Sequence, residues 1–239
     1  MIGVILAAGM GTRFNNTAEE KCCKVIKNIA DAPLISYALD NLASLGIERV
    51  CIVVGEYAAQ IRSVAGDIYK GMKITYARQN DQIGIVNALM CAIKTMEQGD
   101  DIVLQLADEI LIRFNYNLIR REMMNPEYDF FCGFTPENND DIIKKNYSIE
   151  LEGAKLKHCT EKPAVVNNKK KGTGFCFFRK IAVDYLTNIY NEQANTPNNL
   201  CDYINCLLSG GLNGTAVCVA DKEFNINTLS DLIEAEYYL

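Results

Sequence analysis

Residues 1–14 read MIGVILAAGMGTRF, and this stretch decides the fold. The apolar run at its start predicts a buried strand. Gly9 and Gly11 predict a tight turn after it, because glycine lets backbone N–H groups come close to an anion. Arg13 and Lys21 then add positive charge beside those N–H groups. The pattern therefore predicts a strand that leads into a polyphosphate-binding loop.

The stretch resembles the nucleotidyltransferases that make sugar nucleotides and activated head groups, whose pattern is roughly L-A-A-G-x-G-(T/S)-R followed by a lysine. The resemblance implies that the loop wraps a nucleoside triphosphate and that Arg13 and Lys21 neutralise its phosphates. The chain differs from the pattern at Glu20, where proline often precedes the lysine. The implied nucleotide-binding residues of this segment are Leu6, Ala7, Ala8, Gly9, Gly11 and Thr12.

Other interpretations of this loop give weaker matches. A dinucleotide-binding loop needs a third small residue where this chain has Phe14, which disfavours a dehydrogenase. Thr17 and Glu20 have the spacing of a helix capping box, which is compatible with either interpretation.

Composition narrows the class of protein. A chain of 239 residues, 49% of them hydrophobic, fits one α/β domain that buries about 70–75% of its surface. The net charge of −6 disfavours a general nucleic-acid surface. No apolar run approaches the roughly 18 residues that span a bilayer, and the run at 1–8 is too short for a signal peptide. We therefore expect a cytoplasmic protein without nucleic-acid or membrane partners, and leave open whether it forms a homo-oligomer.

The ten cysteines and the single histidine, His158, bear on metal binding. No C-x-x-C pair occurs, and cysteines such as Cys51 and Cys132 lie in apolar runs, where a free thiol packs as a small core residue. This pattern disfavours a zinc site and a disulfide scaffold. A catalytic metal would then be a hard ion held by oxygen, which indicates Mg²⁺.

Strand-like and helical segments alternate through the first half of the chain. The expected strands are 1–8, 49–54, 73–78, 102–107 and 129–134, and the expected helices are 34–45, 58–65, 85–96 and 118–124. This alternation predicts a Rossmann-like, doubly wound, mostly parallel sheet with right-handed crossovers. Ligands of such sheets lie beyond the carboxyl ends of the strands, so residues 6–13 and 107–109 are expected to face one pocket.

The order of elements changes after residue 134. Residues 135–145 are predicted as a polar loop, and residues 169–171, all lysine, as a solvated loop. The other expected elements are a hairpin at 147–151 and 155–159, strands at 174–178 and 215–220, and helices at 181–190, 200–208 and 229–238. We interpret residues 1–239 as a single domain. Its nucleotide-binding half is 1–134, and a smaller β-containing acceptor-binding half with a closing helix is 135–239.

Asp108 is the first candidate metal ligand. It follows the buried run at 102–107, and a carboxylate at the end of a strand suits Mg²⁺ over a phosphate. A helix N-cap is the alternative role for Asp108. Glu109 is adjacent, but its side chain is expected to point elsewhere, so it ranks second.

A late segment, NINTLSDL at 225–232, resembles the segment that supplies the second metal ligand in the same family. The resemblance implies that Asn227, or else Asn225, completes the site with Asp108. Thr228 has an alternative role as the cap of the last helix, with Asp231 near the positive end of that helix. The two roles are compatible, because they use different residues.

Two middle segments resemble the base-binding and acceptor-binding segments of the family. The run QNDQIG at 79–84 implies that Gln79 reads a pyrimidine and that Gly84 clears space for the nucleoside. An amide both donates and accepts, so Gln79 suits uracil, thymine or cytosine, and a plain polar turn is the alternative.

Glu161, Lys162 and Pro163 resemble the E-K-P acceptor segment, followed by a small-residue loop that ends at Gly174. The resemblance implies that Lys162 meets the acceptor phosphate and that Glu161 meets an acceptor hydroxyl or amine. Gly174 would then lie beside the acceptor. A surface ion pair between Glu161 and Lys162 is the alternative.

Together these features predict a Mg²⁺-dependent nucleotidyltransferase. The acceptor phosphate attacks the α-phosphorus of a pyrimidine nucleoside triphosphate, and pyrophosphate leaves. The predicted catalytic residues are Arg13, Lys21, Asp108 and Lys162. We prefer CTP with a phosphocholine-, phosphonate- or similar head group. The short loop, the run EKCCKV at 20–25 and the NINT segment resemble the enzymes with those substrates slightly more. The alternatives are UTP or dTTP with a sugar-1-phosphate, and a non-catalytic nucleotide sensor.

Overall fold

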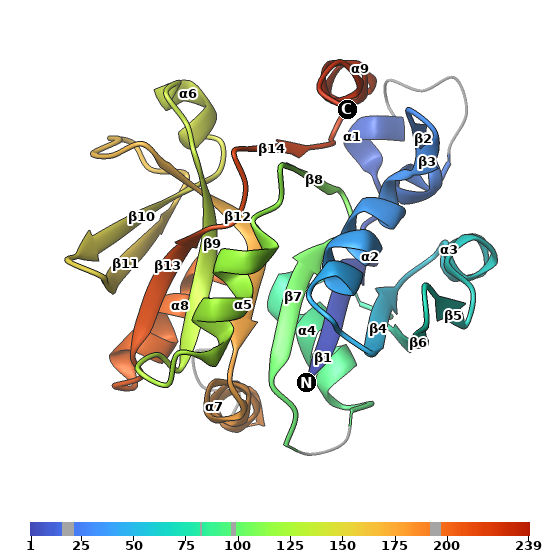
Figure 1. The fold of residues 1–239 in the computed structure, drawn as a ribbon. Coiled ribbons are helices and arrows are strands. Elements are labelled where there is room, and N and C mark those ends of the chain that lie inside the picture. The colour runs from blue at the N-terminus through green and yellow to red at the C-terminus, as the bar shows by residue number, and fades with distance from the viewer. Residues whose placement is uncertain (16–21, 82, 97–98, 192–196) are drawn as a thin grey trace.

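The centre of the fold is a mostly parallel sheet, seen in a computed structural model that describes residues 1–15, 22–81, 83–96, 99–191 and 197–239. Strand β1 (Ile2–Ala7) lies between β7 (Ile102–Leu106) and β4 (Arg49–Val54), and it is parallel to both. Strand β6 (Met72–Arg78) continues the parallel order beyond β4 (Figure 1). The predicted α/β class with a mostly parallel sheet is confirmed.

Helices cover both faces of this sheet, because successive strand residues point to opposite sides. Val4 and Leu6 pack with α4 (Ile85–Ile93), whereas Ile5 packs with α2 (Leu34–Ser44). The other covering helices are α3 (Ala58–Ala65) and α5 (Tyr116–Met124) on the α2 side, and α7 (Lys180–Asn191) and α8 (Leu200–Ser209) on the α4 side. Residues at both faces of β1 are buried, which explains its uninterrupted apolar sequence.

The second half of the chain extends the same sheet with antiparallel strands. Strand β12 (Lys170–Phe178) pairs with β7 and with β9 (Phe130–Pro136), and β13 (Gly214–Cys218) is parallel to β9. The predicted hairpin is formed by β10 (Tyr147–Glu152) and β11 (Lys155–Glu161) at one end of the sheet. The short strand β5 (Ile68–Tyr69) ends the other side, beside β6.

The predictions of loops at 135–145 and 169–171 are each wrong in part. Lys171 is 3% exposed and lies inside β12, although residues 169–171 were expected to be solvated. A run of lysines argues against a strand by propensity, but pairing with β9 and burial override that preference here. Within 135–145, β9 continues to Pro136 and a short helix, α6 (Asp140–Ile143), follows; Asn139 caps that helix through the backbone N–H of Asp141.

A small second sheet escaped the sequence analysis. It pairs β8 (Glu109–Ile112) with β14 (Lys222–Asn225), and each strand is too short to show a clear alternation. A separate apolar cluster lies under it and joins Phe14, Ile110, Phe224 and Ile226. Phe14 is 1% exposed, so it anchors the segment after the glycine loop against this sheet.

The remaining elements lie near the same edge of the fold. They are α1 (Thr12–Asn15), the 3-10 turn η1 (Lys24–Ile26), β2 (Asn28–Ile29), β3 (Ala32–Pro33) and α9 (Leu229–Glu236). In Figure 1, α1, β8, β14 and α9 gather at the top, beyond the carboxyl ends of β1 and β7. Across the described ranges, none of the helices combines the length and apolarity needed to cross a membrane.

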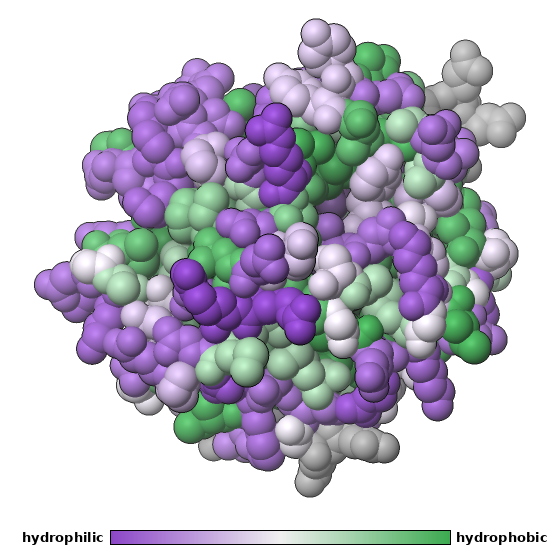
Figure 2. Space-filling model, in the orientation of Figure 1, coloured by the Kyte–Doolittle hydropathy of each residue, from purple (hydrophilic) through white to green (hydrophobic). Residues whose placement is uncertain are grey.

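Figure 2 shows that hydrophilic side chains dominate the visible face, with hydrophobic residues gathered in the recess beneath α9. Ile110, Ile112 and Leu239 line a surface pocket formed by β8 and the end of the chain.

Candidate functional site

The glycine loop leaves β1 at the carboxyl end of the sheet. Leu6, Ala7 and Ala8 are buried, and the chain becomes accessible at Gly9. A Cβ added at Gly9 would meet nothing within 4 Å, so space for a ligand lies beside the backbone there. Gly11 has φ 60°, a left-handed conformation that glycine adopts without strain.

Arg13 and Thr12 follow on α1, where both are exposed. The position of α1 is set by Phe14, which is buried under β8 and β14. Arg13 consequently lines a cavity of about 890 Å³ together with residues of β14 and of the second half of the chain. The structure therefore brings the loop segment to the acceptor side of the predicted site.

Asp108 lies between β7 and β8, so the alternative role as a helix N-cap is wrong. Its backbone oxygen accepts a hydrogen bond from the Ile226 N–H at 2.9 Å, which joins it to the segment after β14. The Ala107 N–H donates to the Leu6 oxygen at 3.1 Å, which places the ends of β7 and β1 side by side. These bonds join the ends of β1 and β7 and tie the backbone of Asp108 to Ile226, while the predicted metal site stays a prediction.

Lys24 is the basic residue that the structure places on Asp108. Its Nζ lies 2.7 Å from Asp108 Oδ2 and donates to the Ile226 oxygen at 2.6 Å. The Lys24 side chain is 11% exposed and that of Asp108 26%, so this ion pair is largely shielded from water. Lys21, the predicted lysine, lies outside the described residues. The missed signal was the run EKCCKV at 20–25, which contains both lysines.

The segment 225–227 forms a compact polar turn next to Asp108. Asn227 Nδ2 donates to Asn225 Oδ1 at 2.9 Å and to the Asn225 backbone oxygen at 3.3 Å. Thr228 caps α9 with a reciprocal capping box to Asp231, as the capping alternative predicted. Capping leaves the asparagines available for another role, because it uses Thr228 and Asp231.

The donor set at this turn fits a hard cation. Asp108 offers a carboxylate, and Asn225 and Asn227 offer amide oxygens, which are the ligand types that Mg²⁺ accepts. Lys24 pairs with Oδ2 of Asp108, so a metal ion at this turn would share that carboxylate with the lysine. Within the part of the chain that the structure describes, this turn included, no group of three or more His, Cys, Asp or Glu side chains could hold a metal ion, so a metal here would depend on the asparagine oxygens.

Gln79 is buried at the end of β6 with its amide orientation fixed. Its Nε2 donates to Asn87 Oδ1 at 2.9 Å and to the Gly84 oxygen at 3.2 Å. Asn87 in turn donates to the Tyr190 hydroxyl at 2.7 Å. Because both amide hydrogens of Gln79 are engaged, only its oxygen is left to contact a base. That oxygen needs a donor, which both cytosine and uracil have.

Gly84 occupies a position that excludes a side chain. Its φ is +112°, and a Cβ there would come within 2.5 Å of the Asn198 backbone oxygen. We expect Gly84→Ala to lower the free energy of unfolding by about 1–3 kcal/mol, measured by urea denaturation. Gly71→Ala is the matched control, since Gly71 has φ +86° with open space around it. Equal losses in the two variants would contradict the clash with Asn198.

The acceptor-side residues line the cavity that Arg13 borders. Glu161 and Lys162 lie at the end of β11, and Lys162 has φ 45° with its N–H donating to the Asn146 oxygen at 2.7 Å. Glu161 Oε2 accepts from the Cys201 thiol at 3.7 Å, and the negative charge of Glu161 adds to burial in raising the pKa of Cys201.

Gly174 contacts the Glu109 carboxylate, and no open space lies beside its Cα. Its N–H donates to Glu109 Oε1 at 2.8 Å and to Oε2 at 2.9 Å, and a Cβ there would lie 2.3 Å from Leu106 Cγ. The Glu109 carboxylate is therefore bonded to β12. The predicted site residues that line the cavity are Arg13, Glu161, Lys162, Gly174, Asn225 and Asn227.

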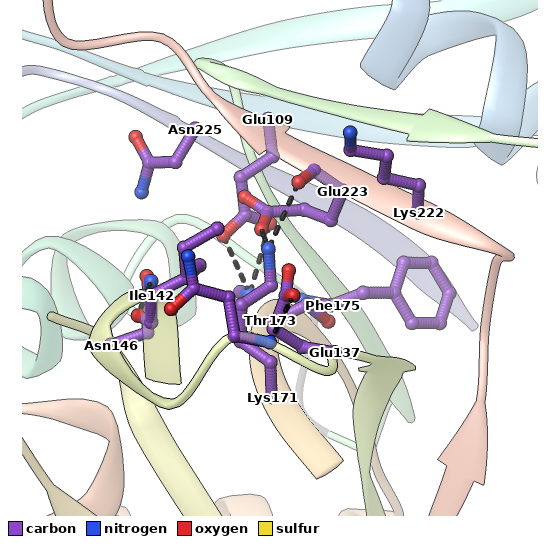
Figure 3. Close-up of polar contacts among 12 residues, drawn as sticks. Glu109, Glu137, Ile142, Asn146, Lys171, Thr173, Phe175, Lys222, Glu223 and Asn225 are labelled. Carbon is purple, nitrogen blue, oxygen red and sulfur yellow. Dashed lines mark hydrogen bonds and ion pairs between the residues drawn. The ribbon is translucent and has the colours of Figure 1, made fainter. Parts of the chain in front are cut away.

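Three charged residues in the cavity wall are buried, which the sequence analysis did not predict. Lys171, Glu109 and Glu223 are each at most 4% exposed, and Lys171 Nζ donates to the Glu223 backbone oxygen at 2.9 Å and pairs with Glu223 Oε2 at 2.5 Å (Figure 3). Burial, then the charges of Glu223 and Asp108, raises the pKa of Glu109 well above its ordinary value. Burial also raises the pKa of Glu223, against the opposing effect of Lys171.

Because of the Lys171–Glu223 pair, we expect substitutions of Lys171 and of Lys169, two lysines of one run, to lower the stability of the protein by very different amounts. Lys171→Met would leave a buried carboxylate without its cation, so we expect a loss of about 3–5 kcal/mol in the free energy of unfolding. Lys169→Met is the control, because the Lys169–Asp140 pair is exposed and removing it should cost less than about 1 kcal/mol. Chemical denaturation of both variants measures this difference, and similar losses would show that Lys171 is not buried.

The fold is α/β, and the cavity lies near the carboxyl ends of β1 and β7, where Arg13 and Leu106 line it. The sequence profile of the Nucleotidyl transferase family matches residues 2–239, so the chain belongs to that family. It is 26% identical over 241 residues to the UTP–glucose-1-phosphate uridylyltransferase AglF of Haloferax volcanii, covering 100% of this chain and 96% of AglF.

Other relatives are longer than this chain. The bifunctional protein GlmU of Geobacillus sp. is 26% identical over 247 residues, and the chain spans about half of its length, 50%. Among solved structures, a UDP-glucose pyrophosphorylase complexed with UDP-glucose has a TM-score of 0.81 at 18% identity, with 99% and 97% of the two chains covered. The inositol-1-phosphate CTP transferase of T. maritima has a TM-score of 0.80 at 16% identity, with 99% and 94% covered. At these identities the structures show the shared fold.

Proposed function

We propose that this protein transfers a nucleoside monophosphate from a pyrimidine nucleoside triphosphate to the phosphate of a small acceptor. One observation carries the proposal. Arg13, Lys162, Asn225 and Asn227 line one cavity, and the Lys24–Asp108 pair is hydrogen-bonded to Ile226, which lies between those two asparagines. Membership of the Nucleotidyl transferase family supports the same reaction class.

The proposed step balances without a general base. An oxygen of the acceptor phosphate forms a new bond to the α-phosphorus. The bond between that phosphorus and the α–β bridging oxygen breaks, and pyrophosphate leaves with the electron pair. A phosphate monoester carries about −1.5 to −2 charge at pH 7, so the attacking oxygen is already deprotonated.

The main barrier that the residues must lower is repulsion between the two anions. Two unit charges about 4 Å apart interact by roughly 4 kcal/mol at an effective dielectric near 20. Arg13, Lys24 and Lys162 would offset this repulsion by binding the phosphates, and Lys21 stays a predicted contributor. Asp108 with Asn227 or Asn225 would hold Mg²⁺, which when bound neutralises phosphate oxygens and orients them.

CTP with a phosphorylated head group is the substrate pair that we propose first. Gln79 supports a pyrimidine, because its free amide oxygen suits the amino group of cytosine. The same oxygen would accept from the ring N–H of uracil, so the cavity on the acceptor side carries the rest of the specificity.

A second candidate is a sugar-1-phosphate with UTP or dTTP. The observation that favours it is the match to AglF along the whole chain, since that relative is a UTP–glucose-1-phosphate uridylyltransferase. The two candidates share the nucleotide side of the site and differ in the acceptor.

A pyrophosphate-release screen tests the proposal. CTP, UTP and dTTP are each crossed with aminoalkyl, choline and hydroxyalkyl phosphates, phosphonates and hexose-1-phosphates, with and without Mg²⁺. We expect release with one pyrimidine triphosphate and one acceptor class, and loss of release on chelation. Tight nucleotide binding without release under any acceptor would replace this proposal with a nucleotide sensor.

A further inference from the structure

A relay of hydrogen bonds joins the two halves of the chain at Gln79. Gln79 Nε2 donates to Asn87 Oδ1 at 2.9 Å, and Asn87 Nδ2 donates to the Tyr190 hydroxyl at 2.7 Å. Gln79 follows β6, Asn87 lies on α4 and Tyr190 lies on α7, 103 residues after Asn87. A residue of the predicted nucleotide-binding half is thus held by a helix of the other half.

Gln79 lies at the same edge of the sheet as the glycine loop. Its backbone N–H donates to the Val54 oxygen at 2.9 Å, at the end of β4, and β4 pairs with β1, which leads into the loop. A Cβ at Gly55, the residue after β4, would lie 2.7 Å from the Ala8 oxygen, so the end of β4 packs against the loop. Two strand spacings separate β6 from β1, so Gln79 lies roughly 10 Å from the loop. A nucleotide bound at the loop can therefore reach Gln79.

The Gly84 carbonyl sets the direction of the relay. A carbonyl oxygen only accepts hydrogen bonds, so the Gln79 group 3.2 Å from it must be the NH2 group. The second hydrogen of that NH2 group needs an acceptor, which is Asn87 Oδ1. The Asn87 NH2 group is then left to donate to Tyr190. Turning either amide around would bring two acceptors or two donors together.

The relay leaves only the oxygen of the Gln79 amide for a ligand. Among the described residues none donates a hydrogen bond to Gln79 Oε1, and that oxygen is not sealed in the interior. An amide held in this way accepts a hydrogen bond and donates none to the ligand. A base that fits it presents an N–H group, as the amino group of cytosine and the ring N–H of uracil do.

We propose that Asn87 and Tyr190 are positioning residues for base specificity, because they hold Gln79 so that it binds only a base with an N–H donor. This inference rests on the proposed nucleotidyl transfer and deepens it by naming the residues that select the base. A glutamine amide that is free to turn can present either its oxygen or its NH2 group, and it then tolerates a base without the donor. The relay removes that second possibility.

A triphosphate whose base lacks the donor tests the inference on the unaltered protein. The probe is the triphosphate of 2-pyrimidinone riboside, which has neither the amino group of cytosine nor the ring N–H of uracil. Its kcat/KM in pyrophosphate release is compared with that of the preferred pyrimidine triphosphate. We expect the probe to be about tenfold to a hundredfold worse, because the Gln79 oxygen loses its donor.

Two substitutions of Asn87 then test the relay. Asn87→Leu removes the acceptor of the Gln79 NH2 group, so we expect the ratio between the two triphosphates to fall to about threefold or less. Asn87→Asp keeps an acceptor for Gln79 and a second oxygen for the Tyr190 hydroxyl, so it should retain a ratio of about tenfold or more. A general loss of activity lowers both rates and leaves their ratio unchanged.

A matched pair of tyrosines tests the far end of the relay. Tyr190→Phe removes the hydroxyl that accepts from Asn87, and the ratio should again fall to about threefold or less. Tyr185→Phe is the control, since Tyr185 lies on the same helix with its ring beside Gly210. That control should keep the full ratio.

The outcomes separate the inference from the function on which it rests. Equal use of the probe and the preferred triphosphate by the unaltered protein overturns base selection by Gln79 and leaves nucleotidyl transfer standing. An unchanged ratio in Asn87→Leu, or an equal loss in Asn87→Asp, overturns the positioning role of Asn87. An unchanged ratio in Tyr190→Phe overturns that of Tyr190. Absence of pyrophosphate release with every acceptor overturns the transfer reaction, and calorimetric binding of the same two triphosphates then decides the inference.

Discussion

Asp108→Asn is expected to lower kcat about a hundredfold to a thousandfold in the pyrophosphate-release assay. The substitution keeps the shape of the side chain and the backbone bond to Ile226, but it removes the charge at the end of β7. Without that charge, Mg²⁺ and the triphosphate would lose their anchor in the proposed reaction, and Lys24 would lose its ion pair.

Two measurements show whether the loss of turnover comes from the reaction itself or from unfolding of the variant. The thermal midpoint should fall, because Lys24 is 11% exposed and loses its ion pair, so turnover is measured well below the midpoint of the variant. Asp184→Asn is the control, since this exposed acid pairs with Lys180 on α7, outside the cavity. Near-normal turnover of Asp108→Asn at saturating substrate and Mg²⁺ would show that Asp108 does not support the reaction.

Lys24→Met is expected to reduce kcat/KM for the triphosphate about a hundredfold. Lys24 is the cation that the structure places on Asp108 and on the Ile226 oxygen, where the metal and phosphates are proposed to bind. Loss of its charge should weaken binding of the anion and also release the segment after β14.

Parallel variants of neighbouring lysines identify which cation matters. Lys27→Met is the control, because Lys27 is exposed and follows η1 directly. Lys21→Met tests the lysine that the motif predicted. A full loss in Lys21→Met with normal kinetics in Lys24→Met would assign the triphosphate to Lys21 and leave Lys24 a structural role. A lower thermal midpoint with unchanged kinetics in Lys24→Met would also assign Lys24 a structural role.

The sequence by itself determined the fold class and predicted a place for the site. The apolar runs of β1, β4 and β7 and the amphipathic helices between them are local patterns, and they predicted the parallel sheet closely. The capping role of Thr228 with Asp231 could also be predicted from the sequence, because a capping box depends on a spacing of three residues. Where strands of such a sheet end, ligand-binding residues follow, so Arg13 and Asp108 could be named in advance.

Only the tertiary structure decided which charges meet. Lys24 contacts Asp108 across 84 residues, and Lys171 contacts Glu223 across 52. Nothing local distinguishes Lys171 from Lys169, yet one is buried in β12 and the other lies in an exposed ion pair. The reason is physical. A pattern of neighbours along the chain sets secondary structure, whereas burial and pairing of a charge depend on strands that meet only after the sheet has formed.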